Sequence, residues 1–202
     1  MPTIPPTGVG GAQGAAGAYD TKPQHLEGST YVMSIPNGSG GNLDVKLELD
    51  SGAETTRKIG GAPVNCYAFA RARKSNIPGG TRGPVGLPYM VKPDSTHEAL
   101  LKDGGIPLGL NPFSMSGREP IELDPDETYY LVAAMTAREE YHFARLFSDG
   151  WWAKPSKVKL AHQMGDTVDV PDTKTEFKGK LCKLGGRTKY NPLGYYLFPA
   201  PK

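Results

Sequence analysis

The sequence predicts an α+β fold in which short helices pack on an antiparallel β-sheet. Residues 43–49 alternate between apolar and charged side chains, which is typical of a half-buried strand. Residues 128–135 form a nearly continuous apolar and aromatic run, which indicates a central strand. Between these strands, a loop rich in Gly and Pro gives way at Cys66 to a stretch of helix formers. The sequence therefore mixes strand and helix patterns.

The domain organisation is simple. The chain has 202 residues, of which 38% are hydrophobic, and this is enough for one domain with its own core. Residues 1–24 are dominated by Gly, Pro, Ala and Thr, so we expect a flexible tail that is a linker, a docking handle or a terminus without a role. Residues 25–202 are expected to form a single α+β domain.

The first half of the domain contains a hairpin and two short helices. Two strand patterns between Thr30 and Asp50 flank a turn at 36–41. The helix that begins at Cys66 is expected to end near Ser75, before a Gly/Pro-rich loop. Residues 95–98 read Ser-Thr-His-Glu, a capping box that predicts a helix stopping at 104–105.

The second half is mostly strand. Residues 141–146 follow the central strand, and Asp149-Gly150 between two aromatic-rich runs indicates a hairpin turn. A two-residue turn at that point places Leu146 opposite Ala153 and His142 opposite Lys157. Residues 194–199 are expected to form a closing strand, with Cys182 half-buried in another strand.

Cys66 is the candidate nucleophile, because a thiol in the first turn of a helix lies near free backbone N–H groups and a positive dipole end. Both favour thiolate over thiol. This role requires Cys66 to be a free thiol and not to form a disulfide with Cys182. Its neighbour Asn65 is interpreted either as the helix N-cap or as an amide donor that supports an oxyanion.

His142 is the candidate general base. With Ala144 and Leu146 it occupies the apolar face of its strand, where a lone histidine is either a catalytic group or a core residue with satisfied hydrogen bonds. A Cys and a His on separate elements are the smallest set of side chains that supports acyl transfer. His97, in the predicted capping box, is the reserve candidate for the base.

Charge and cysteine content argue against several classes of function. The chain has 23 Lys and Arg against 21 acidic residues, a net charge of +2 that predicts no binding of nucleic acid or of an anionic membrane surface. Its two cysteines belong to no CxxC pair, so we expect no metal site and no cofactor. No stretch has the apolar length of a membrane helix, and residues 1–17 do not resemble a secretory signal. We therefore expect synthesis in the cytoplasm. Export by a route that needs no cleaved signal remains an alternative.

Four short blocks follow one another along the chain. They are Asn65-Cys66-Tyr67-Ala68, Tyr141-His142-Phe143, Asp149-Gly150-Trp151-Trp152 and Gly194-Tyr195-Tyr196. The order of a helix-start Cys followed by a His on a sheet strand resembles the papain-like cysteine hydrolases, especially the NlpC-type branch of peptidoglycan amidases and endopeptidases, in which the Cys helix packs against an antiparallel sheet whose next strands carry the His. The four blocks together resemble those of a group of bacterial papain-like proteins.

The resemblance implies a papain-like fold and a hydrolase that cleaves an amide bond in a peptide or a peptidoglycan stem. It also suggests a toxin or effector delivered by a specialised secretion system, with an immunity or delivery protein as partner. One departure matters, because the strand after His142 offers only Lys154 where such families place a group that orients the imidazole. A transferase or deamidase with the same Cys/His pair, and a non-catalytic binding or structural protein on this fold, remain alternatives.

Overall fold

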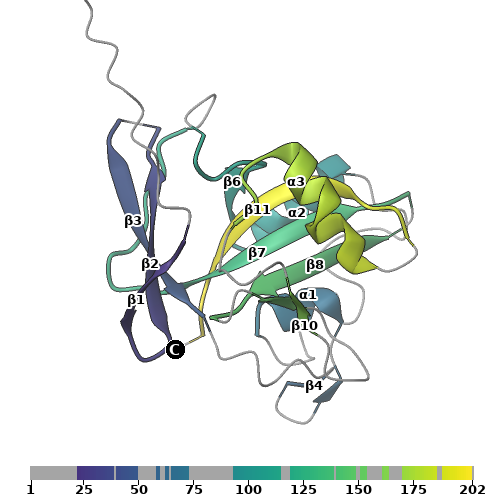
Figure 1. Ribbon diagram of the computed structural model, residues 1–202, viewed down its shortest axis with the longest axis horizontal. Coiled ribbons are helices and arrows are strands. Elements are labelled where there is room, and N and C mark those ends of the chain that lie inside the picture. The colour runs from purple at the N-terminus through teal and green to yellow at the C-terminus, as the bar shows by residue number, and fades with distance from the viewer. Residues whose placement is uncertain are drawn as a thin grey trace, which may run out of the picture.

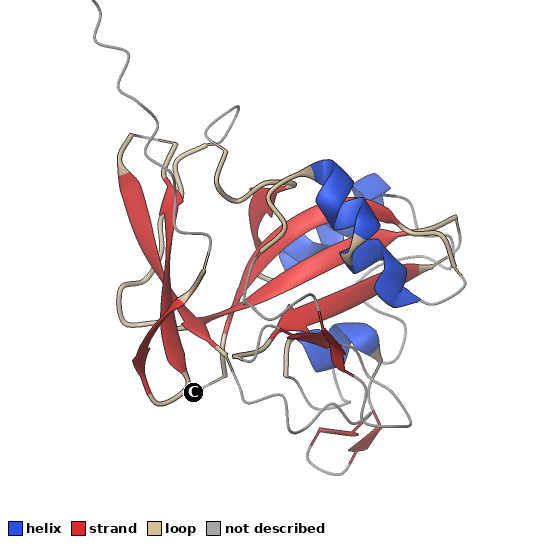
Figure 2. Ribbon diagram, viewed as in Figure 1, coloured by secondary structure: helices blue, strands red, loops and turns tan. Residues whose placement is uncertain are grey.

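The computed structural model describes residues 22–38, 40–49, 58–59, 62–63, 65–72, 93–114, 119–138, 140–148, 151–153, 161–163, 170–185 and 188–201. The predicted tail and the Asp149-Gly150 turn lie outside these residues, except for the last three residues of the tail. Helices and a mixed sheet make up an α+β fold (Figures 1 and 2). The elements are β1 (Gln24–Glu27), β2 (Thr30–Pro36), β3 (Asn42–Glu48), β4 (Lys58–Ile59), β5 (Ala62–Pro63), α1 (Cys66–Ala70), α2 (Pro93–Lys102), β6 (Ile106–Gly109), β7 (Tyr129–Thr136), β8 (Tyr141–Leu146), β9 (Trp151–Ala153), β10 (Ala161–Gln163), α3 (Lys174–Gly179), the 3-10 helix η2 (Leu181–Gly185) and β11 (Asn191–Pro199).

Strands β7 and β11 form the centre of the sheet. They pair antiparallel along their whole length, from Asn191 opposite Thr136 to Pro199 opposite Tyr129. Strand β6 lies beyond β11, and β8, β9 and β10 follow on the other side of β7. The predicted central strand is therefore confirmed, and the predicted closing strand is a central strand too.

The N-terminal hairpin confirms the alternating pattern. Strands β2 and β3 pair antiparallel, with Val45 and Leu47 buried and Asp44 and Lys46 exposed. β3 also joins β7 in parallel at one pair, Leu47 opposite Tyr129. Figure 1 shows β1, β2 and β3 as a twisted unit beside the main sheet. Its buried side chains belong to the same apolar cluster as residues of β7, so the hairpin is packed onto the core.

Helices cover both faces of the central sheet. Leu131, Ala133 and Met135 of β7 pack in the cluster that includes Phe177 of α3 and Leu181 of η2. The alternate residues, Tyr130, Val132 and Ala134, pack in a second cluster with Tyr67 of α1 and Leu100 of α2. Because both faces are covered, β7 needs apolar side chains at every position, which explains its unbroken apolar run.

Three of the predicted boundaries and registers are wrong. Helix α1 ends at Ala70, not near Ser75, since Arg71 is its C-cap and Ala72 has a positive φ of 49°. The helix predicted at 95–98 begins earlier, at Pro93, so the capping-box residues lie inside α2. Proline suits the first helical turn, where its missing N–H is not needed.

The register between β8 and β9 differs by one residue from the prediction. Leu146 lies opposite Trp152, and Arg145 lies opposite Ala153. The prediction took its register from an assumed two-residue turn at Asp149-Gly150, which lies outside the described residues. In addition, Cys182 lies in the 3-10 helix η2 and not in a strand, and it is 5% exposed.

Gly105 lies in the connection between α2 and β6, where the chain packs closely against Phe198. A Cβ atom there meets Phe198 Cζ at 2.7 Å and the Leu100 carbonyl oxygen at 2.9 Å. We expect Gly105→Ala to destabilise the protein by about 1–3 kcal/mol, measured by urea denaturation. Gly179→Ala is the matched control, since a Cβ there has nothing within 4 Å. Equal stability of the two variants would contradict the packing described here.

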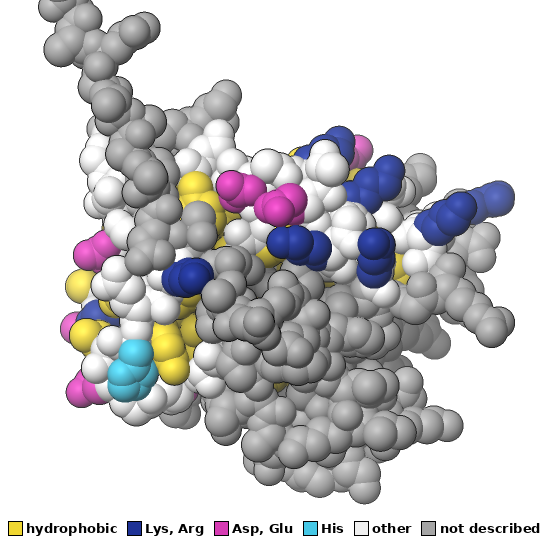
Figure 3. Space-filling model, viewed as in Figure 1, with side chains coloured by type: hydrophobic (Ala, Val, Ile, Leu, Met, Phe, Trp, Pro, Cys, Tyr) yellow, Lys and Arg dark blue, Asp and Glu magenta, His cyan; other side chains and the backbone are white. Residues whose placement is uncertain are grey.

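The small net charge is unevenly distributed. The segment that contains α3 and η2 carries five exposed lysines, and Figure 3 shows basic side chains gathered on this side of the molecule. Two acidic residues, Asp172 and Glu176, lie in the same segment. The lysines are Lys174, Lys178, Lys180, Lys183 and Lys189.

Candidate functional site

Cys66 is the first residue of α1, as the sequence predicts, and it is a free thiol. The helix packs against β8, and Cys66 Sγ lies 4.0 Å from the carbonyl oxygen of Tyr141. The backbone N–H groups of Phe143, Tyr67 and Cys66 also approach the sulfur. Since β9 pairs with β8 only at Arg145 and Leu146, the thiol lies beside a part of β8 that β9 does not cover.

The electrostatics of Cys66 differ from the expectation. Burial raises the pKa of the thiol to about 11, and this effect outweighs the three N–H groups, which lower the pKa. The carboxylate of Glu140 raises it further. A five-residue helix has a weak dipole, so the helix start does not offset the loss of solvation. The resting side chain is therefore a neutral thiol near pH 7.

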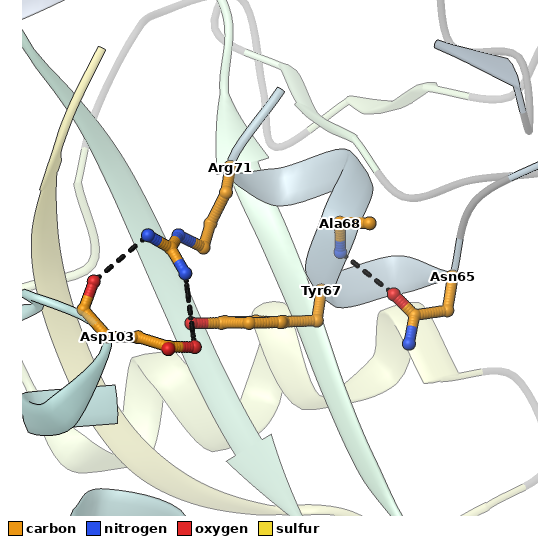
Figure 4. Close-up of polar contacts among 5 residues, drawn as sticks. All are labelled: Asn65, Tyr67, Ala68, Arg71 and Asp103. Carbon is orange, nitrogen blue, oxygen red and sulfur yellow. Dashed lines mark hydrogen bonds and ion pairs between the residues drawn. The ribbon is translucent and has the colours of Figure 1, made fainter. Parts of the chain in front are cut away.

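Asn65 is the N-cap of α1, which confirms one of its two interpretations. Its side-chain oxygen accepts a hydrogen bond from the backbone N–H of Ala68 at 2.8 Å (Figure 4). Its Nδ2 is buried and, within the described part of the chain, has no hydrogen-bond partner. The capping bond uses only the oxygen, so the amide N–H groups stay available as donors beside Cys66.

His142 is the second residue of β8 and is 9% exposed. It lies opposite Met135 of β7, and Lys157, its predicted partner on the other side of β8, lies outside the described residues. Its ring packs against Tyr190, with ring centroids 5.5 Å apart and an angle of 34° between the planes. Tyr190 belongs to the apolar cluster under α3, together with Ala144 and Leu146. Because strand residues alternate, His142 faces the α3 side of the sheet.

Cys66 and His142 thus lie at the same short stretch of β8. The sulfur touches the main chain of Tyr141, the residue before His142. The ring of Tyr190 packs on His142, and the charge of a Cys66 thiolate adds to the raised pKa of the Tyr190 phenol, after the larger effects of burial and Glu140. The thiol packs with the cluster of α1 and α2, while the imidazole lies on the α3 face, so the two side chains are on different faces of the sheet.

His97 lies elsewhere, in α2, on the opposite side of the sheet from α3. Its Nδ1 is 2.7 Å from the hydroxyl of Tyr196, a residue of the cluster shared by α1 and α2. This hydrogen bond gives His97 a packing role. Lys154, the departure noted in the sequence, lies outside the described residues, as do the side chains of Trp151 and Trp152.

A buried polar network beneath α1 escaped the sequence analysis. Arg71 is 3% exposed and forms an ion pair with Asp103 at 3.1 Å. Its Nη1 donates to the hydroxyl of Tyr67 at 2.9 Å, and that hydroxyl donates to Asp103 at 2.5 Å (Figure 4). Tyr67 and Arg71 are four residues apart, a spacing that places two side chains on one helix face and was a usable signal. The network ties the helix of Cys66 to the end of α2.

The described residues offer no other obvious site near Cys66. A cavity of about 590 Å³ lies along β6, between residues 106–111 and 119–122, at the edge of the sheet away from β8. Among the described side chains, no group of three His, Cys, Asp or Glu is placed to hold a metal ion. Within the same residues, no helix has the length and apolar character needed to cross a membrane.

Comparison with models of known protein families, with curated proteins and with solved structures finds no match.

The raised thiol pKa has a consequence for stability. The folded protein holds the Cys66 proton more tightly than the unfolded chain, whose thiol has a pKa of 9.0. The contribution of the Cys66 thiol to the free energy of unfolding is fully present below pH 9, and it is lost as the pH rises from about 9 to about 11. Cys182 adds an effect of the same sign, because burial raises the pKa of its thiol to about 11.

We expect the free energy of unfolding to fall between pH 9 and pH 10, and to fall less steeply in a Cys66→Ala/Cys182→Ala variant. Urea denaturation at several pH values measures the slope. A slope that is the same in both proteins would show that the thiols are solvated in the folded state.

Proposed function

We propose that this protein is a papain-like cysteine hydrolase that cleaves an amide bond, with Cys66 as nucleophile and His142 as general base. The observation that carries the proposal is the position of Cys66 Sγ, 4.0 Å from the carbonyl oxygen of the residue before His142. Two further observations support the proposal: Cys66 is a free thiol at a helix start, and His142 belongs to the strand packed against that helix. A peptide or a peptidoglycan stem peptide is the proposed substrate.

The proposed reaction begins with a neutral thiol. His142 takes the proton from Cys66 as the sulfur attacks the carbonyl carbon, and the carbonyl electrons move to the oxygen. N–H groups around the sulfur, together with Asn65 Nδ2, are the donors available to that oxyanion. Collapse of the intermediate breaks the C–N bond, and the imidazolium gives its proton to the leaving amine. Water, deprotonated by His142, then hydrolyses the thioester and restores the thiol.

The proposed reaction requires the His142 ring to turn from the α3 face toward the thiol, because an imidazolium stabilises a buried thiolate only at close range. The raised thiol pKa therefore fits a mechanism in which His142 removes the proton during the attack. It does not fit a resting thiolate.

A second candidate is a non-catalytic binding or structural protein. The observation that favours it is the same burial that raises the Cys66 pKa to about 11, since structural cysteines are commonly buried and inert. A transferase or deamidase uses the same two residues. It differs from a hydrolase only in whether water or an amine accepts the acyl group.

Alkylation by iodoacetamide separates these candidates. A hydrolase with a working Cys66/His142 pair is expected to react at Cys66 well below about pH 8, and His142→Ala should abolish that reactivity. A thiol without help from an imidazole should react only as the pH approaches its own pKa of about 11. Mass spectrometry of the labelled peptide distinguishes Cys66 from Cys182. Inert Cys66 at pH 8 would overturn the hydrolase proposal.

A further inference from the structure

Tyr190 is a buried aromatic residue beside His142 that has no role in the proposed reaction steps. It is 6% exposed and lies just before β11, next to the exposed Lys189. Its ring packs on the imidazole of His142, with centroids 5.5 Å apart and planes inclined by 34°. This contact restricts rotation of the imidazole, because the phenol ring occupies the space beside one face of the imidazole.

The hydroxyl of Tyr190 is held in turn. It is hydrogen-bonded to the carboxylate of Glu140 and interacts with the side chain of Thr188. Burial raises the pKa of the Tyr190 phenol, and the charge of Glu140 adds to this effect, so the phenol keeps its proton. A protonated phenol donates its hydrogen bond, and the carboxylate of Glu140 accepts it.

Glu140 itself has a defined place. It precedes β8 directly, two residues before His142, and its backbone oxygen accepts a hydrogen bond from Ala137 N at 2.7 Å. Its carboxylate also acts on Cys66, whose pKa it raises. One carboxylate thus interacts with Tyr190 and with the thiol, and Tyr190 packs against the imidazole.

We propose that Tyr190, with its hydroxyl bonded to Glu140, is the positioning residue for His142. This inference rests on the proposed function, in which His142 is the base. In it, the ring of Tyr190 sets the plane of the imidazole, and the carboxylate of Glu140 supplies the negative charge that stabilises the imidazolium. The pair takes the part of the orienting group that the sequence does not provide after His142.

A packing role alone predicts a different result from a positioning role. Packing needs only the ring, which Tyr190→Phe keeps, whereas positioning also needs the hydroxyl and the carboxylate. Tyr190→Phe and Glu140→Gln therefore isolate the polar contribution. Two matched controls lie far from His142: Tyr129→Phe, whose hydroxyl accepts a hydrogen bond from Asp124 N, and Glu122→Gln, at the cavity along β6.

The first measurement does not depend on activity. Proton NMR titration of the full chain gives the pKa of the His142 imidazole, assigned by comparison with His142→Gln. Loss of a nearby carboxylate destabilises the imidazolium, so Glu140→Gln should lower this pKa by about half a unit or more, with Tyr190→Phe acting in the same direction. The other ionisable groups on elements packed against β8 are unchanged in both variants; they are Tyr129 and Tyr130 of β7, Cys66 and Tyr67 of α1, and Cys182 and Lys183 of η2.

The second measurement is turnover of the peptide substrate. We expect a fall in kcat of roughly tenfold or more in both variants, with KM little changed, because misplaced catalytic groups slow the chemical step. Tyr129→Phe and Glu122→Gln should match the wild type.

The outcomes separate this inference from the proposed function. An imidazole pKa that is the same in the wild type and both variants overturns the positioning role, whatever the activity. A shifted pKa in a wild-type protein without turnover supports the positioning role and overturns the hydrolase proposal. If Tyr190→Phe fails to fold, the Glu140→Gln variant alone tests the positioning role. Glu140 is exposed, so its substitution does not disturb the core.

Discussion

Cys66→Ala is expected to abolish turnover of the amide substrate while the fold stays intact. Removal of the nucleophile leaves only binding and oxyanion contacts, so we expect a loss of at least about a thousandfold in kcat. His142→Ala should have a similar effect, since the neutral thiol then has no base. The measurement is hydrolysis of purified peptidoglycan and of generic peptides, with circular dichroism to verify folding.

Cys182→Ala is the matched control for the nucleophile, because Cys182 is the other free thiol and is itself buried. His97→Ala and His162→Ala are the controls for the base. If His97→Ala stops turnover and His142→Ala does not, the base is assigned to the wrong histidine. If every variant keeps full activity, the reaction does not use this pair.

Asp103→Ala is expected to cost about 3 kcal/mol of stability, which is typical for removing one partner of a buried ion pair. The carboxylate of Asp103 forms an ion pair with Arg71 and accepts a hydrogen bond from the hydroxyl of Tyr67. The backbone oxygen of Asp103 accepts a second hydrogen bond, from Arg71 Nη2 at 2.9 Å. The substitution leaves a guanidinium in a site where its carbon is 4.7 Å from the centroid of the Phe198 ring. Urea denaturation measures the loss.

Lys180→Ala is the control for Asp103→Ala. It removes the 3.3 Å ion pair with Glu176, in which both side chains are more than 40% exposed, so the expected loss is at most about 0.5 kcal/mol. If the two variants lose the same free energy, water screens the Arg71–Asp103 pair and α1 is not held to α2 by it.

Local patterns predicted the strands well because each strand has a repeating environment. Alternation at 43–49 reflects one buried and one exposed face, and the unbroken run of β7 reflects two covered faces. The end of α1 was not predictable in this way. Its sequence favours a longer helix, but the chain turns at Arg71, whose guanidinium is buried against Asp103. That partner is 32 residues away and leaves no local signal.

The candidate site was predicted in part for a similar reason. The start of α1 at Cys66, the N-cap at Asn65 and the strand of His142 follow from short motifs. The high pKa of the thiol depends on burial by residues distant in sequence, so no motif predicts it. Tyr190 was missed because it lies beside a lysine and an asparagine, outside any apolar run. The 3-10 helix η2 packs against both β8 and β11, and the chain between η2 and β11 brings Tyr190 to His142.

The central place of β11 has a consequence for the newly made chain. On the ribosome, β6 and β7 emerge more than 50 residues before β11. Until β11 arrives, both strands have backbone N–H and C=O groups without their final partner, and such open edges are prone to aggregate. Pairing over this distance is also slow, because a long loop must close first. We therefore expect a chaperone or a low temperature, either of which protects the unfinished chain, to raise the yield of folded protein.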